Sequence, residues 1–351
     1  MSWFMFALIC LLGWGFADLF YKLGTDENDR YSHLKIAVWV GLVMGVCALI
    51  LIPFSESFAP GAEEKKGFFV SAVKYAPASL CYIISMVIGY AGLRYLEMSI
   101  VSPVQNASGG MSAIVMFVFF SIKGTTEEIG TLDLIGTVLI VAGVIWLAIE
   151  ENRLSRREIA ENAQDRKYRF GALALIFPLL YCLFDTIGTS ADGIILDEEH
   201  GLGLGEIDVL VLYGLTFMLA GLGAWIFLRV KTGKFYNPFA KSEKYKCVAA
   251  LCEEAGQVFY VYAMAKNPVV AAPMVASYCI VSVILSRLIV KEKLDARRYL
   301  CVITVIAGIV LLGISEGLGE REEAEELAQE SAGVLRRIKE TASLILNGSM
   351  W

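Results

Sequence analysis

Long apolar stretches alternate with short polar connections over most of this chain. A membrane-spanning helix needs about 20 mainly apolar residues, and the chain matches that template ten times. The predicted spans lie near residues 3–23, 36–53, 76–96, 99–121, 134–149, 170–188, 209–227, 248–265, 269–290 and 300–314. The pattern therefore predicts an all-α integral membrane protein with ten transmembrane helices.

The two halves of the chain resemble each other. The run "SIVSPV" matches "VVAAPM", which aligns Pro103 with Pro273 early in the fourth and ninth spans. The run "TVLIVAGVIWL" matches "TVIAGIVLL", which aligns Gly143 with Gly308. Because five is an odd number, a second five-helix unit enters the membrane upside down relative to the first. Inverted repeats of this kind are typical of alternating-access transporters.

This repeat divides the chain into segments. Residues 1–150 form the first predicted five-helix repeat, 151–168 a charged linker and 169–316 the second repeat. In the tail at 317–351, apolar residues recur at helical spacing among charged ones. We expect an amphipathic helix there, lying on the membrane or against a partner, although a solvated tail explains the pattern equally well.

Composition agrees with the membrane prediction and restricts the chemistry. The chain is 57% hydrophobic and 19% charged, with a mean hydropathy of +0.61, which is too apolar for a soluble domain of 351 residues. It has two histidines, and its eight cysteines are scattered singly without a metal-ligand spacing. No G-x-x-x-x-G-K-[ST] sequence is present, which argues against direct ATP drive. We therefore expect no enzyme activity, no cofactor and no metal centre.

Several of these features together resemble a known family. Ten spans in a five-plus-five arrangement, a short hairpin between spans three and four, and the run "SRLIVKEKLDARRYLCVITVIAGIVLLG" are similar to the EamA-type transporters of the drug/metabolite transporter superfamily. The first half departs from the pattern, since "SIKGTTEEIGTLD" is longer than the compact turn found there in the family. The resemblance implies transport of small solutes, commonly export, through a central cavity between the repeats.

Ionisable residues within predicted spans are candidate functional residues. Asp18 and Lys22 lie one helical turn apart, so they can neutralise each other, whereas Trp14 on the same face would suit an organic cation. Asp185 occupies nearly the same place in the second repeat, and it is either a cavity residue or a hydrated residue near the surface.

The eighth span carries a polar stripe. Glu253, Gln257 and Tyr260 follow i, i+4, i+7 spacing, so they share one face, which must point into the bundle or a cavity. Glu254 lies about 100° around the helix from Glu253. Two adjacent carboxylates in a cavity repel each other, which favours binding of a proton to one of them and so suits proton coupling. Glu253 is the stronger candidate for this role, and structural roles for both acids stay open.

The fourth span contains "PVQNASGG". Pro103 should kink this helix, as Pro273 should kink the ninth span, and both are candidate hinges. Asn106 offers an amide for substrate binding beside the carbonyls that proline leaves exposed.

These observations predict a secondary active transporter of a small polar or cationic organic metabolite, working by alternating access and coupled to protons. One alternative is a divalent-cation carrier that holds hydrated Mg²⁺ with carboxylates. A less favoured alternative is an intramembrane enzyme or receptor-like protein.

The expected partners are the lipid bilayer and a small-molecule substrate. A homodimer stays open, and nothing indicates nucleic acid. Most of the 30 Lys and Arg fall in odd-numbered loops, so the positive-inside rule predicts a multi-pass cell-membrane protein with those loops in the cytoplasm and both termini outside. This differs from the resembled family, whose termini are usually cytoplasmic.

Overall fold

The computed structural model of the chain describes residues 1–26, 28–61, 66–95, 98–124, 130–161, 176–197, 199–290, 296–319 and 321. The amphipathic pattern predicted for the tail and the second part of the charged linker lie outside these residues. The first part of that linker, up to Glu161, continues a helix. Across the described ranges the secondary structure is helical, without strands.

The helices follow the predicted apolar segments closely. They are α1 (Trp3–Gly24), α2 (Ser32–Leu51), α3 (Phe68–Gly92), α4 (Met98–Asn106), α5 (Ser108–Lys123), α6 (Thr131–Glu161), α7 (Ile176–Ile195), α8 (Glu206–Thr232), α9 (Lys244–Lys266), α10 (Pro268–Ala276) and α11 (Tyr278–Leu285). Short helical turns η1 (Ile52–Phe54), η4 (Lys241–Glu243) and η5 (Ser286–Val290) extend or precede them, and a final helix covers Ala296–Gly319.

Eight helical segments in the described part of the chain are long and apolar enough to cross a membrane. They comprise α1, α2 with η1, α3, α4 with α5, the first part of α6, α8, α10 with α11, and the final helix. The helices α7 and α9 are not among them; they carry buried or half-buried acids such as Asp185 and Glu253. The predicted all-α membrane fold is thus confirmed, whereas the count of ten spans stays a prediction.

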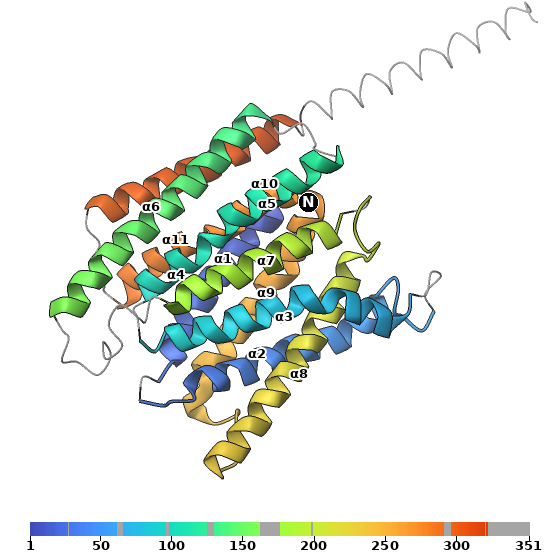
Figure 1. Cartoon of the computed structure of the whole chain (residues 1–351), viewed down its shortest axis with the longest axis vertical. Helices are drawn as coiled ribbons and strands as arrows, with labels where there is room; N and C mark the ends of the chain where they lie inside the picture. Colours follow the sequence, from blue (N-terminus) through green and yellow to red (C-terminus); the bar gives the residue numbers. More distant parts are fainter. Residues whose placement is uncertain are drawn as a thin grey trace, which may run out of the picture.

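The helices pack as antiparallel pairs (Figure 1). On α1 and α9, Gly13 lies against Gly256 and Gly24 against Lys246, so the two helices run in opposite directions. The pairs α3–α7 and α2–α8 pack in the same way. We call the end of the bundle where α1 begins the N-terminal end, and the other the opposite end.

Glycines allow the closest of these contacts. A Cβ atom on Gly41 of α2 would lie 2.5 Å from the carbonyl oxygen of Phe217 on α8 and 2.8 Å from the Cα of Gly221. Both neighbours are backbone atoms, which cannot move aside without moving the helix. Small residues at helix crossings are the usual means of tight packing within membranes.

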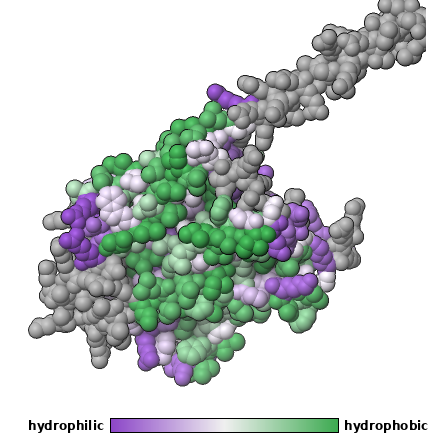
Figure 2. All heavy atoms as spheres, turned by 45° about the horizontal axis from the view of Figure 1, so that its top comes forward, coloured by the Kyte–Doolittle hydropathy of each residue, from purple (hydrophilic) through white to green (hydrophobic). Residues whose placement is uncertain are grey.

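Polar and apolar residues are distributed in the reverse of a soluble protein. Large apolar side chains such as Ile50, Ile114 and Leu219 are more than half exposed, whereas Ser79 and Ser282 are fully buried. Figure 2 shows a broad hydrophobic surface with hydrophilic residues gathered towards its ends. An apolar outer surface suits lipid, because hydrocarbon offers no partner for polar groups. The chain is therefore a multi-pass membrane protein.

The fourth and ninth predicted spans are each interrupted, at matching places. The break lies at Ala107 between α4 and α5, and at Ser277 between α10 and α11. We expected the distortion at Pro103 and Pro273, but in both spans the helix is interrupted four residues later. At Ser277 the side-chain Oγ donates to the Met274 carbonyl oxygen at 2.5 Å, which adds a competing donor to the helical hydrogen bonds.

Candidate functional site

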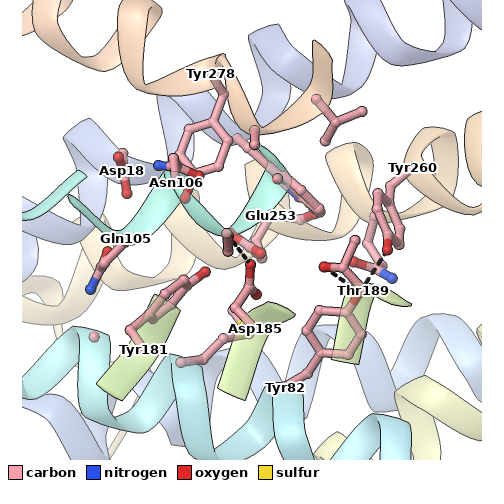
Figure 3. Close-up of a pocket in the computed structure, with 18 of the residues that line it drawn as sticks. Asp18, Tyr82, Gln105, Asn106, Tyr181, Asp185, Thr189, Glu253, Tyr260 and Tyr278 are labelled. Carbon is pink, nitrogen blue, oxygen red and sulfur yellow. Dashed lines mark hydrogen bonds between the residues drawn. The ribbon is translucent and has the colours of Figure 1, made fainter. Parts of the chain in front are cut away.

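A cavity lies in the middle of the bundle and is lined by side chains from both halves of the chain (Figure 3). Its volume is about 60 Å³. The polar and aromatic lining residues are Trp14, Asp18, Tyr21, Tyr82, Tyr90, Gln105, Asn106, Ser108, Tyr181, Asp185, Thr189, Tyr213, Glu253, Gln257, Tyr260 and Tyr278. The cavity extends towards the opposite end of the bundle, where Leu93 follows α3.

Three acids from three helices line this cavity: Asp18 of α1, Asp185 of α7 and Glu253 of α9. Asp18 Oδ2 accepts hydrogen bonds from Ser102 Oγ at 2.5 Å and Ser282 Oγ at 2.8 Å. The described lining contains no Lys, Arg or His side chain. The acids therefore give the cavity a concentration of negative charge without a cationic counterpart in its lining.

Asp185 and Glu253 each have polar side chains beside their carboxyl groups. Asp185 Oδ2 accepts from Ser108 Oγ at 2.6 Å, and Tyr181 lies beside the same carboxyl group. Glu253 is 9% exposed, and its carboxyl group lies beside Tyr21. The indole nitrogen of Trp14 donates to the backbone carbonyl oxygen of Glu253 at 3.2 Å. The indole thereby fixes α1 against α9 at the level of the acid.

Aromatic rings form much of the remaining wall. Seven tyrosines and Trp14 line the cavity. The ring centroid of Trp14 lies 5.2 Å from that of Tyr260 and 5.7 Å from that of Tyr278. Tyr21 and Tyr90 face each other with centroids 4.7 Å apart. Electron-rich ring faces beside carboxylates provide the chemistry that binds organic cations.

Two amide groups contribute hydrogen-bond donors that are not in use. The Nε2 atoms of Gln105 and Gln257 are buried and have no hydrogen-bond partner among the described residues. Asn106 differs, because its Nδ2 donates to the Ser102 carbonyl oxygen at 2.8 Å and so holds the end of α4 in place. Buried polar atoms without a partner are rare, and those in a cavity are natural contacts for a solute or for water.

The cavity ends towards the N-terminal end of the bundle in a contact between three hydroxyl groups. The Tyr82 and Tyr260 hydroxyl oxygens are 2.6 Å apart, and Tyr82 also donates to Thr189 Oγ1 at 3.1 Å. These residues come from α3, α9 and α7. We call them the tyrosine contact.

Of the residues predicted from sequence, Trp14, Asp18, Asn106, Asp185, Glu253, Gln257 and Tyr260 line this one cavity. Asp185 lines the cavity in the structure, and its role there stays a prediction. Glu254 lies outside the cavity: it is half-buried and its carboxyl group lies beside Cys47 of α2.

Other lining residues escaped the sequence analysis. They are chiefly Tyr181 and the tyrosines at 21, 82, 90, 213 and 278. Tyr181 had a usable signal, since it lies four residues before Asp185 on the same helical face. The remaining tyrosines come from four helices, α1, α3, α8 and α11, and resemble ordinary core residues in the sequence.

Among the described residues, no group of three or more His, Cys, Asp and Glu side chains could hold a metal ion directly. The divalent-cation alternative stays a prediction, because a hydrated ion would be bound through its waters.

The comparisons with known proteins bear on both sequence and fold. Residues 201–314 match the model of the EamA-like transporter family, a region from just before α8 into the final helix. A search of curated proteins finds no match.

Solved structures also match, 28 chains in all. One, described as "Crystal structure of protein", has a TM-score of 0.53 and 13% sequence identity, and the alignment covers 86% of this chain and 97% of that one. At such low identity the likeness concerns the fold alone. The family match agrees with the resemblance predicted from sequence: residues 201–314 are similar to the EamA-like transporter family, a family of transporters.

Proposed function

We propose that this protein is a secondary active transporter of a small polar or cationic organic solute, coupled to protons through Glu253. The observation that carries the proposal is the lining of the central cavity. Asp18, Asp185 and Glu253 face a small space whose described lining contains no Lys, Arg or His. Carboxylates brought together in a water-poor cavity repel one another, so protons or a cationic solute are needed to neutralise them.

The aromatic wall supports an organic cation as the solute. A quaternary or protonated amine in the cavity would meet the aromatic rings that line it, among them Trp14 and Tyr278, while Asp18 and Glu253 would supply the opposite charge. The orphan amides of Gln105 and Gln257 would bind polar groups elsewhere on the same solute. An inorganic cation would leave these aromatic and amide contacts unused.

The small volume supports a conformational cycle. About 60 Å³ has room for only a few water molecules, so an organic solute requires the helices to move apart. The interruptions at Ala107 and Ser277 lie beside the cavity, between α4 and α5 and between α10 and α11. Interrupted helices of this kind let one part of a bundle move against another.

The packing supports ten spans in two inverted repeats. If α1 corresponds to α7 and α3 to α9, the antiparallel contacts α1–α9 and α7–α3 are equivalent. The alignment of Gly143 with Gly308 also pairs Gly136 with Cys301. A Cβ atom on Gly136 would lie 3.0 Å from the carbonyl oxygen of Gly308, and one on Gly143 would lie 3.4 Å from the carbonyl oxygen of Cys301. Each residue thus lies near the counterpart of the other, as a twofold axis between the repeats requires.

Charge distribution supports the predicted orientation. Basic residues gather at the opposite end of the bundle, among them Arg30, Lys35, Arg94, Arg153, Lys231, Lys234, Lys241, Lys244, Arg297 and Arg298. By the positive-inside rule we place this end, which carries the odd-numbered loops, in the cytoplasm, with the protein in the cell membrane. The test is a reporter that is active only in the cytoplasm, fused after Trp351. Activity of this fusion would contradict the orientation.

The test of the transport function is a counterflow assay in proteoliposomes. Vesicles are loaded with members of a panel of quaternary ammonium ions, primary amines, neutral amino acids and carboxylates, and uptake of the same labelled solute is measured. We expect saturable counterflow for organic cations or polar amines, with little for carboxylates. Counterflow confined to carboxylates would contradict a cavity built around three acids.

A further inference from the structure

The polar face of α7 continues beyond the central cavity. Tyr181, Asp185, Thr189 and Asp192 follow i, i+4, i+8, i+11 spacing, so they lie on one side of the helix. The first three line the cavity, whereas Asp192 lies outside it. Thr189 belongs to the tyrosine contact, so Asp192 lies one turn past that contact, towards the N-terminal end, and three residues before α7 finishes at Ile195.

Asp192 is a fully buried acid with an incomplete set of partners. Its side chain has no exposed surface. Oδ1 accepts a hydrogen bond from the Tyr75 hydroxyl of α3 at 3.0 Å, whereas Oδ2 is buried without a partner among the described residues. An ionised carboxylate held in this way would lose its hydration with little compensation. The site thus requires a positively charged ligand bound to the carboxylate.

We propose that Asp192 is a second proton-binding site, separated from the central cavity by the tyrosine contact and exchanging its proton with the N-terminal end of the bundle. The inference builds on the proposed function, to which it adds the side from which protons enter or leave. In the present conformation Oδ2 carries the proton and Tyr75 donates to Oδ1. When the bundle opens at this end, the Oδ2–H bond breaks, the proton passes to water and Asp192 remains as the carboxylate.

The groups around Asp192 favour a proton over a metal ion. Tyr75 and Tyr82 of α3 lie beside it, while Tyr260 of α9, Tyr213 of α8 and Asp185 of α7 are close enough to interact with it electrostatically. None of these groups is positively charged.

The side chains described nearest to Gly193, the residue after Asp192, are not ion ligands of the oxygen type. Beside Gly193, α5 contributes Met116 and α10 contributes Pro268, which do not ionise. A sodium or calcium ion needs several oxygen ligands, whereas a proton needs one oxygen atom.

Tyr82 connects this site to the cavity. Its hydroxyl lies near Asp192 and also forms both hydrogen bonds of the tyrosine contact. Removing this hydroxyl leaves Tyr260 without its 2.6 Å partner and should loosen the separation between cavity and Asp192. Exchange of the Asp192 proton with solvent therefore reports how tightly the contact is closed.

The experiment is infrared spectroscopy of the full-length protein in lipid, produced with aspartate labelled with ¹³C at the side-chain carboxyl. The label distinguishes protonated aspartates from glutamates by their carbonyl stretch. We expect a band from a weakly hydrogen-bonded protonated aspartate at neutral pH that Asp192→Asn removes and Asp197→Asn retains. Asp197 is the matched control, because it lies five residues further on and hydrogen-bonds to His200 near the surface.

Two further variants keep the proposal testable if Asp192→Asn fails to fold. Tyr75→Phe removes the donor to Oδ1, so the aspartate band should shift to higher frequency. After transfer to D₂O, the band should exchange slowly in the unaltered protein and several-fold faster in Tyr82→Phe. A band that survives Asp192→Asn, or exchange that is equally fast in both proteins, would overturn the assignment. Loss of the band on adding sodium chloride at constant pH would also overturn it, because it would show that the carboxylate binds a sodium ion in place of a proton.

This outcome is separate from that of the proposed function. If Glu253→Gln retained full proton-driven transport while the Asp192 band behaved as expected, the role of Glu253 would be lost and the Asp192 site would stand. If the band were absent while Glu253→Gln abolished coupling, the Asp192 site would be lost and the role of Glu253 would stand.

Discussion

Two buried acids near the N-terminal end of the bundle differ sharply in their surroundings. Asp208, at the start of α8, is 1% exposed and accepts from Ser55 Oγ at 2.6 Å, from Ser57 Oγ at 2.5 Å and from the backbone nitrogens of Ser57 and Gly205 at 3.2 and 3.3 Å. Asp192, also fully buried, accepts from the Tyr75 hydroxyl at Oδ1, whereas its Oδ2 has no hydrogen-bond partner among the described residues. Asp208 also benefits from the partial positive charge at a helix N-terminus.

This comparison separates structural acids from acids that bind something. Four donors compensate the buried charge of Asp208 completely, so that residue joins the η1 region to α8 and has no need of a ligand. Asp185 and Glu253 in the cavity resemble Asp192 more closely. Ser108 and Tyr181 lie beside the carboxyl group of Asp185 and Tyr21 beside that of Glu253, which are fewer polar partners among the described residues than Asp208 has. Incomplete hydrogen bonding, more than burial itself, identifies the acids that bind protons or a solute.

The largest effect on stability is expected for Asp208→Ala. The substitution removes the N3 side chain that accepts from the Gly205 backbone nitrogen at the start of α8, and it leaves buried hydroxyl and amide donors unpaired at about 1–3 kcal/mol each. We expect a loss of roughly 3–5 kcal/mol in the free energy of unfolding, visible as a much lower melting temperature in detergent. Transport per folded molecule should change little. A melting temperature close to that of the unaltered protein would contradict the structural role of Asp208.

The next effect is on solute binding. Asp18→Asn keeps the size of the side chain and can still bond to Ser102 and Ser282, but it removes a negative charge from the cavity. A contact with a charged group contributes about 1.5–3 kcal/mol, so KM for a cationic solute should rise roughly tenfold or more. The melting temperature should stay nearly the same. An unchanged KM, measured by counterflow, would show that the charge of Asp18 does not contribute to solute binding.

The smallest effect is expected at the opposite end. Glu243 forms a 2.8 Å ion pair with Lys246 and accepts from the Tyr236 hydroxyl at 2.9 Å. Burial alone would raise the pKa of Glu243, but the hydrogen bond and charge of Lys246 outweigh it and lower the pKa below its usual 4.5. A lowered pKa in the folded state stabilises the protein above pH 4.5, and this stabilisation is lost as the pH falls further.

Glu243→Gln should therefore lower the melting temperature slightly at neutral pH, with a difference that shrinks on acidification. The measurement is a series of thermal unfolding curves between neutral and acidic pH. A difference that grew towards acid would contradict the ion pair as its source.

Much of the fold could be predicted from sequence, because spans in a bilayer must be long, apolar and helical. Every predicted apolar segment overlaps a described helix, and residues 170–175 of the sixth segment lie outside the described part of the chain. The stripe of Glu253, Gln257 and Tyr260 was also predictable, since helical spacing and the cost of lipid exposure together determine which way it faces. The interruptions at Ala107 and Ser277 were not, because they depend on local hydrogen bonds one turn beyond the prolines.

The site was only partly predictable. Asp192 lies next to the acidic run "LDEEH", so composition assigned it to a loop, whereas the structure extends α7 to Ile195 and buries it. Glu254 has the same sequence context as Glu253, and only packing shows that it turns towards Cys47. The tyrosines that meet in the cavity come from helices far apart in the chain, and contacts of that kind leave no local pattern.

The most direct test of the central claim compares Glu253→Gln with Glu254→Gln in proteoliposomes. For each variant, uptake of an organic cation identified by counterflow is measured with and without an imposed pH gradient. The account predicts that Glu253→Gln loses acceleration by the gradient while retaining measurable counterflow, and that Glu254→Gln keeps both. Gradient-driven uptake at the full rate in Glu253→Gln would contradict the claim that this carboxyl group couples transport to protons.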